Sequence, residues 1–129
     1  GELIGGNLSL LQACLQSDAT LDTKDKILFI EEIGEYRYSI DRMLFSLKRA
    51  GYFKELKGLI IGDISRIKAN TTPFGKSNEE IVLNVVKEYG FPVLFDFPAG
   101  HEADNRALIL GREVNLEVGE KESTLTFKN

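Results

Sequence analysis

The segment from Lys26 to Glu32, which reads KILFIEE, decides how this chain folds. Its four apolar residues, Ile27 to Ile30, are continuous and do not alternate with polar ones. Such a run is typical of a strand that is buried on both faces, as in a parallel sheet. Two carboxylates, Glu31 and Glu32, follow where this strand ends. The segment therefore predicts a central buried strand with acidic side chains at its carboxyl end.

Helical and extended patterns alternate along the rest of the chain, which indicates an α/β layer architecture. Apolar residues recur at helical spacing after residue 7, over residues 38–50 and from about residue 78. Gly51 and Gly90 follow the second and third of these patterns, where a left-handed glycine commonly ends a helix. The expected fold is a mixed sheet with about three helices. Its remaining strands are predicted over residues 59–61 and 92–97, with a C-terminal β-meander over 107–110, 113–116 and 123–127.

The composition is that of one ordinary globular domain. Hydrophobic residues make up 43% and charged residues 28% of the 129 residues, so we expect one domain with one core over residues 1–129. The net charge of −4 argues against a nucleic-acid partner, which requires a basic surface. No apolar run approaches the roughly 18 residues of a membrane span, so no membrane partner is expected.

Cysteine content and the start of the chain bear on its cellular context. The single cysteine, Cys14, forbids an internal disulfide and supports no thiol-ligated metal, so a reducing cytoplasm is the expected location. We expect Cys14 to be buried in a helix and not to be a catalytic thiol. The chain opens at Gly1 without an initiator methionine and without the basic and apolar segments of a signal peptide. We therefore expect a fragment or an excised domain.

Two polar segments follow predicted strands, which is where function collects in open α/β sheets. One is the pair Glu31 and Glu32, and the other is the loop 98–105, which holds the only histidine, His101. A neutral imidazole can accept a proton on one nitrogen while a carboxylate holds the N–H of the other. Glu31 and Asp104 are both candidates for that carboxylate. No serine lies in a G-x-S-x-G elbow, so the chain is expected to lack a nucleophile.

These residues also have structural explanations. A single loop histidine is more often a surface or hydrogen-bonded structural residue than a catalytic one, and acidic residues at a strand end often cap the following helix. A metal site formed by His101 with Asp96, Glu102 and Asp104 is disfavoured, because one imidazole without a thiolate serves zinc poorly.

Three parts of the chain together resemble a known family. The first is LIGGNL at residues 3–8, and the second is ILFIEEIGE at 27–35, continued by YSIDRML at 38–44. The third is FPV at 91–93, followed by FPAGH at 97–101. In order and spacing they resemble the C-terminal domain of the LD-carboxypeptidase family, which includes muramoyltetrapeptide carboxypeptidases and microcin-immunity peptidases.

The resemblance implies a swivelling β/β/α domain and a Ser–Glu–His triad divided between two domains. Glu31 then corresponds to the orienting glutamate and His101 to the general base, whereas the family often has aspartate where this chain has Glu32. The serine and its oxyanion hole are expected in an N-terminal domain, so this chain alone is expected to be inactive. Gly6 and Asn7 are expected either to line the cleft between the domains and bind substrate, or to form a tight turn before the first helix.

The activity that the resemblance implies is that of a serine carboxypeptidase. It removes terminal D-alanine from cytoplasmic muropeptide tetrapeptides in peptidoglycan recycling, without a metal or cofactor. The expected partners are the N-terminal domain of the same enzyme, the muropeptide substrate and a second copy in a homodimer. One alternative is a microcin-immunity-type hydrolase of peptidyl or aminoacyl nucleotide analogues, and another is a non-catalytic binding module.

Overall fold

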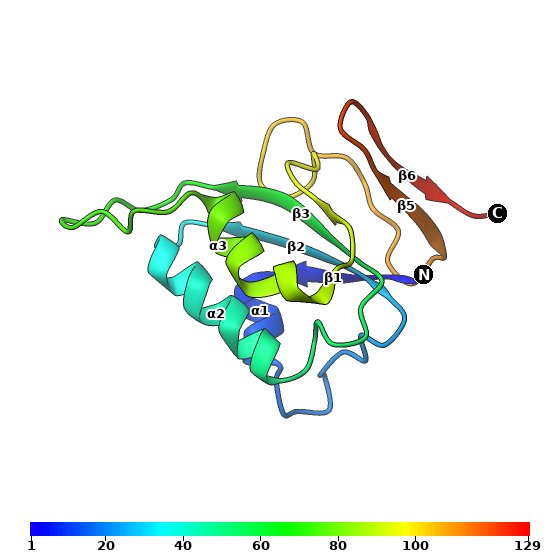
Figure 1. Cartoon of the computed structure of the whole chain (residues 1–129), viewed down its shortest axis with the longest axis horizontal. Helices are drawn as coiled ribbons and strands as arrows, with labels where there is room; N and C mark the ends of the chain where they lie inside the picture. Colours follow the sequence, from blue (N-terminus) through cyan, green and yellow to red (C-terminus); the bar gives the residue numbers. More distant parts are fainter.

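The computed structural model describes all of residues 1–129, as a parallel sheet of four strands, three α-helices and a C-terminal hairpin (Figure 1). The predicted α/β class with three helices is confirmed, but the four-stranded sheet is wholly parallel and not mixed, because the antiparallel C-terminal strands pair in a sheet of their own. The elements in chain order are β1 (Leu3–Asn7), α1 (Leu8–Ala13), β2 (Ile27–Ile33), α2 (Arg37–Arg49), β3 (Gly58–Ser65), α3 (Asn78–Val86), the 3-10 helix η1 (Lys87–Tyr89), β4 (Val93–Leu94), β5 (Val114–Val118) and β6 (Ser123–Phe127).

The parallel sheet has the strand order β1-β2-β3-β4, so the predicted buried strand β2 has a neighbour on each side. Leu28 and Ile30 of β2 belong to the buried cluster under the helices, whereas Ile27 and Phe29 belong to a second cluster on the opposite face. Successive side chains of a strand point to opposite faces of the sheet. Because both faces are covered, all four of these residues are apolar.

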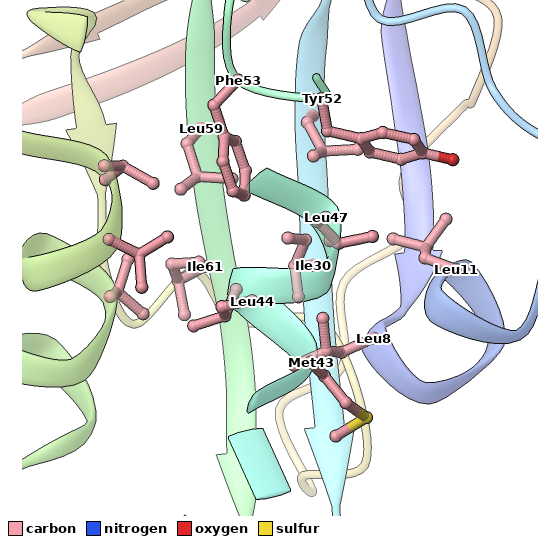
Figure 2. Close-up of a cluster of buried hydrophobic side chains, with 14 of the residues drawn as sticks. Leu8, Leu11, Ile30, Met43, Leu44, Leu47, Tyr52, Phe53, Leu59 and Ile61 are labelled. Carbon is pink, nitrogen blue, oxygen red and sulfur yellow. The ribbon is translucent and has the colours of Figure 1, made fainter. Parts of the chain in front are cut away.

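The helices α1, α2 and α3 cover one face of the sheet (Figure 1). Figure 2 shows Leu44 and Leu47 of α2 beside Ile30 of β2 and Ile61 of β3. These four side chains are at most 3% exposed. Burial of one such side chain contributes about 1.5–3 kcal/mol. Apolar packing therefore holds the helices on the sheet.

The other face of the sheet is covered by the hairpin of β5 and β6 and by the chain that precedes it (Figure 1). Val114 of β5 packs there with Leu3, Phe29 and Ile60 in the second buried cluster. The layers therefore follow the order hairpin, parallel sheet, helices. This is the β/β/α layering that the resemblance implies.

Residues 3–7 form a strand, β1, and not a tight turn before the first helix. Leu3 lies opposite Ile27, and Asn7 lies opposite Glu31. A Cβ atom on Gly5 would lie only 1.9 Å from the carbonyl oxygen of Phe29. The close approach of β2 thus requires glycine here, although paired glycines in a sequence usually indicate a turn.

The strand predicted over residues 92–97 is short in the structure, where β4 comprises only Val93–Leu94. Asp96 has a φ of +55°, in the left-handed region, and a strand cannot continue through that conformation. The chain then enters the loop 98–106, which carries His101.

The first strand of the predicted C-terminal meander, over residues 107–110, does not form, so the tail is a two-stranded hairpin. Ile109 and Leu110 are 54% and 50% exposed, although their apolar character suggested a buried strand. The chain after this segment touches the edge of β1: the N–H of Gly111 donates to the carbonyl of Leu3 at 2.7 Å.

Side-chain caps mark the starts of two helices, and a glycine follows α2 where it was predicted. Asn7 caps α1 by accepting a hydrogen bond from the N–H of Leu10, and Ser77 caps α3 in a capping box. Gly51, with a φ of +85°, follows α2. The prediction that Cys14 is buried in a helix is wrong, because α1 ends at Ala13 and Cys14 is a partly buried C-cap residue. None of the helices combines the length and apolar character that a bilayer span requires.

Candidate active site

Glu31 and His101 meet at the carboxyl edge of the parallel sheet. Glu31 belongs to β2, and His101 lies in the loop that follows β4. Nδ1 of His101 lies 2.8 Å from Oε2 of Glu31, which is hydrogen-bonding distance. The Glu31 side chain is 10% exposed and the His101 side chain 46% exposed. A nearly buried carboxylate thus holds one ring nitrogen while almost half of the His101 side chain remains accessible.

Strand alternation gives Glu31 and Glu32 different partners, because consecutive side chains point to opposite faces. Glu31 faces the loop that carries His101. Glu32 faces the helices, is only 3% exposed, and ties β2 to the start of α1. It accepts four hydrogen bonds, from Nδ2 of Asn7 at 2.9 Å, the N–H of Ser9 at 2.9 Å, Oγ of Ser9 at 2.6 Å and the N–H of Ile33 at 3.0 Å.

These hydrogen bonds determine the ionisation of Glu32. Burial by itself raises the pKa of a carboxyl group, but the hydrogen bonds from Ser9, Ile33 and Asn7 together outweigh it. The pKa of Glu32 therefore lies below its ordinary value of 4.5. Glu32 is a structural carboxylate that stays ionised at neutral pH, and it is not in contact with His101.

The two predicted substrate-binding residues have different surroundings. The amide of Asn7 is used within the chain, because its Nδ2 donates to Glu32 and its Oδ1 accepts from Leu10. Gly6 lines a groove of about 380 Å³ together with Gly100, on the side of the sheet away from the helices. Substrate contact by Gly6 or Asn7 stays a prediction.

Asp104, the other candidate partner of the imidazole, pairs instead with Arg106, at 3.3 Å. Asp104 does not bind the imidazole, because the loop directs Nδ1 of His101 toward Glu31. The side chains of His, Cys, Asp and Glu nowhere form a group of three or more that could hold a metal ion.

Two residues that sequence reasoning missed hold the main chain of this loop. Oδ2 of Asp63 accepts a hydrogen bond from the N–H of His101 at 3.3 Å, and Oδ1 of Asn105 accepts one from the N–H of Gly100 at 3.0 Å. Neither residue belongs to a motif with a known spacing. The available signal was weak: Asp63 follows a predicted strand, at the edge where polar groups of α/β sheets collect.

The contact with Glu31 indicates which nitrogen of the imidazole carries a hydrogen atom. An ionised carboxylate only accepts hydrogen bonds, so beside it Nδ1 of His101 is the donor, and in the neutral imidazole Nε2 is then the nitrogen with the free lone pair. A histidine oriented in this way can act as a general base, and the carboxylate stabilises the imidazolium that forms. Within this chain, His101 hydrogen-bonds only to Glu31 and Asp63. Fold and site together define an α/β domain that presents an oriented acid–base pair.

Comparison with known proteins identifies the family to which this domain belongs. The model of the LD-carboxypeptidase C-terminal domain matches residues 1–116, so the chain belongs to that family as its C-terminal domain. The chain is 34% identical over 125 residues to a probable murein peptide carboxypeptidase of Bacillus subtilis, covering 97% of this chain and 39% of that protein.

Solved structures share the fold. A crystal structure of muramoyltetrapeptide carboxypeptidase from Oxalobacter formigenes matches with a TM-score of 0.90 and 29% identity, over 100% of this chain and 44% of that one. MccF in complex with glutamyl sulfamoyl guanosine matches with a TM-score of 0.68 and 25% identity, over 77% of this chain and 29% of that one. The chain thus spans less than half the length of the proteins that it resembles.

Proposed function

We propose that this chain is the domain that carries glutamate and histidine in a serine-type LD-carboxypeptidase, an enzyme that removes terminal D-alanine from muropeptide tetrapeptides. The observation that carries this proposal is the 2.8 Å contact between Nδ1 of His101 and Oε2 of Glu31. The printed names of the relatives, a murein peptide carboxypeptidase and a muramoyltetrapeptide carboxypeptidase, support the substrate class.

In this mechanism, Nε2 of His101 takes the proton of a serine hydroxyl as the serine oxygen attacks the carbonyl carbon of the scissile amide. Glu31 stabilises the imidazolium through Nδ1. The imidazolium then gives its proton to the leaving amine of D-alanine, and the acyl group remains on the serine. His101 next takes a proton from a water molecule as the water oxygen attacks the ester carbonyl, and gives this proton to the serine oxygen as the ester C–O bond breaks.

The serine and the oxyanion hole belong, in this proposal, to an N-terminal domain of the same polypeptide. The isolated chain is then inactive, because a base without a nucleophile and an oxyanion hole supplies little catalysis. We also propose a cytoplasmic place in peptidoglycan recycling and assembly as a homodimer, both of which rest on the family resemblance.

The test compares the full-length enzyme with its His101→Ala and Glu31→Gln variants on a tetrapeptide that ends in an L,D-linked D-alanine. Each substitution is expected to reduce D-alanine release by about 10⁴-fold. Glu102→Gln is the matched control, because Glu102 is exposed and adjacent to His101 but has no hydrogen bond to it. It should retain wild-type activity.

The outcomes separate the proposal from its alternatives. Release of D-alanine that survives His101→Ala would exclude this histidine from the mechanism. The fold shared with MccF favours one second candidate, a hydrolase of aminoacyl or peptidyl nucleotide analogues. Cleavage of such a conjugate without cleavage of the tetrapeptide would establish that candidate, and inertness toward both would indicate a binding module.

A further inference from the structure

We propose that Asp63 is a positioning residue, whose carboxylate fixes the main chain of His101 so that the imidazole stays aligned with Glu31. This inference rests on the proposed function, because it concerns the same acid–base pair. It adds a third residue, from a third strand, to the groups on which the reaction depends.

The order of the strands places Asp63 between Glu31 and His101. Glu31 comes from β2 and His101 follows β4, and β3 lies between these strands. Ile30 pairs with Ile61 and Glu32 with Ile64, so the pairing shifts by one residue at this point. Gly62 and Asp63 together therefore oppose Glu31. Such a bulge re-aims a side chain and is common beside active sites.

Asp63 binds the His101 loop on both sides of Gly100. Its main-chain N–H donates to the carbonyl of Ala99 at 2.8 Å, and its Oδ2 accepts from the N–H of His101 at 3.3 Å. One residue thus engages the main chain immediately before and immediately after Gly100. Two contacts that flank a single residue restrict rotation of the peptide groups between them.

The loop is also packed without spare room against Asp63. A Cβ atom on Gly100 would lie 2.8 Å from Cβ of Asp63 and 3.4 Å from Cβ of Glu31. On the neighbouring strand position, a Cβ atom on Gly62 would lie 2.4 Å from the carbonyl oxygen of Ala99. Glycine at both positions lets the loop approach the strand ends closely enough for His101 to reach Glu31.

A further hydrogen bond fixes the Asp63 carboxylate itself. Oγ of Ser65 donates to the same Oδ2 atom at 2.7 Å, so this oxygen accepts from Ser65 and His101 together. Asn105 holds the preceding N–H, that of Gly100, from within the loop. Asp63 is therefore oriented before substrate binds, which is what a support for a catalytic group requires.

The experiment measures kcat and KM of the full-length enzyme on the L,D-linked tetrapeptide, and records the Nδ1–H proton signal of His101 by NMR. In Asp63→Ala, kcat is expected to fall by about 10²-fold, the cost of a misplacement of about 1 Å, with KM unchanged. The Nδ1–H signal is expected to broaden or disappear. Asp63→Asn keeps an oxygen that can accept both hydrogen bonds, and should recover most of kcat and the signal.

The matched control is Asp104→Ala, which removes a carboxylate from the same loop that contacts Arg106 and not His101. It should leave kcat and the signal unchanged. Wild-type kcat in Asp63→Ala would overturn the inference. An Asp63→Asn enzyme as slow as Asp63→Ala would also overturn it, because charge and not placement would then be the cause.

Two further variants keep the inference testable in other circumstances. If Asp63→Ala does not fold, Ser65→Ala replaces it, and a kcat unaffected by loss of the Ser65 hydroxyl would overturn the inference. An active His101→Ala enzyme would refute the proposed function itself. An inactive His101→Ala enzyme together with a fully active Asp63→Ala enzyme would refute only the role of Asp63.

Discussion

Replacement of Glu32 by glutamine should destabilise the domain although it changes only one atom of the side chain. Oε1 of Glu32 accepts from Asn7 and from the N–H of Ile33, and Oε2 accepts from the N–H and the hydroxyl of Ser9. The glutamine amide replaces one of these oxygens by an NH₂ group. In either orientation, a main-chain N–H of Ile33 or Ser9 then faces a donor. Asn7 cannot compensate by rotating its amide, because its Oδ1 already caps Leu10.

The magnitude follows from these contacts. One orphaned, buried N–H costs about 1–3 kcal/mol. Replacement of a charged acceptor by a neutral one weakens the remaining hydrogen bonds of Glu32 by about 1 kcal/mol in total. We therefore expect Glu32→Gln to lower the free energy of unfolding by about 2–4 kcal/mol at neutral pH. Urea denaturation followed by circular dichroism measures this difference.

The pH dependence provides the stricter test. Because hydrogen bonds hold the pKa of Glu32 below its ordinary value of 4.5, ionised Glu32 stabilises the folded state fully above that value. The contribution is lost as the pH falls through the lower, folded-state pKa. The stability difference between wild type and Glu32→Gln should therefore narrow in acid. Glu120→Gln, at an exposed turn, is the control and should match wild type. A difference below about 0.5 kcal/mol at neutral pH, the size of an ordinary surface effect, would refute the reasoning.

Three other substitutions test separate parts of the structure. Gly100→Ala places a Cβ atom 2.8 Å from Cβ of Asp63 at a φ of +141°. It should therefore lower the free energy of unfolding by about 1–3 kcal/mol and slow D-alanine release by the full-length enzyme about 10²-fold. Activity equal to that of the wild type would show that the loop is not tightly held. Leu47→Ala leaves a cavity at a fully buried position of α2, and should lower the free energy of unfolding, measured by urea denaturation, by about 2–5 kcal/mol. Ser77→Ala removes one half of the capping box with Glu80 and should cost about 1 kcal/mol in thermal unfolding, whereas Ser77→Asp should retain most of the stability.

Local elements were predictable where their signals lie within a few residues of one another. The helix predicted over residues 38–50 is α2 at Arg37–Arg49, because its apolar spacing and the following Gly51 both act over one or two turns. The continuous apolar run before Glu31 identified the buried strand β2 for the same reason. His101, the partner of Glu31, was identified as a candidate because it is the only histidine and lies in a loop after another predicted strand.

The elements that prediction missed depend on distant parts of the chain. Gly5 reads as part of a turn, but it pairs with Phe29 of β2 and so belongs to a strand, and only glycine fits because a Cβ atom would lie 1.9 Å from the carbonyl oxygen of Phe29. Residues 107–110 look like a strand but join no sheet, because the hydrogen bonds to the start of the chain begin only at Gly111 and Arg112, which bind Leu3. No short-range pattern distinguishes these outcomes, since each is decided by contacts between segments far apart in sequence.

The sequence by itself determined the alternating α/β elements, the buried strand that ends in Glu31 and Glu32, and the candidate base His101. Only the tertiary structure shows that Glu31, which the family resemblance favoured over Asp104, lies within hydrogen-bonding distance of the imidazole, and that Asp63 of the intervening strand holds the loop. The physical reason is the difference in range. Periodicity and capping are set by neighbours along the chain, whereas a hydrogen bond across 70 residues exists only when parallel strands bring their carboxyl ends to one edge.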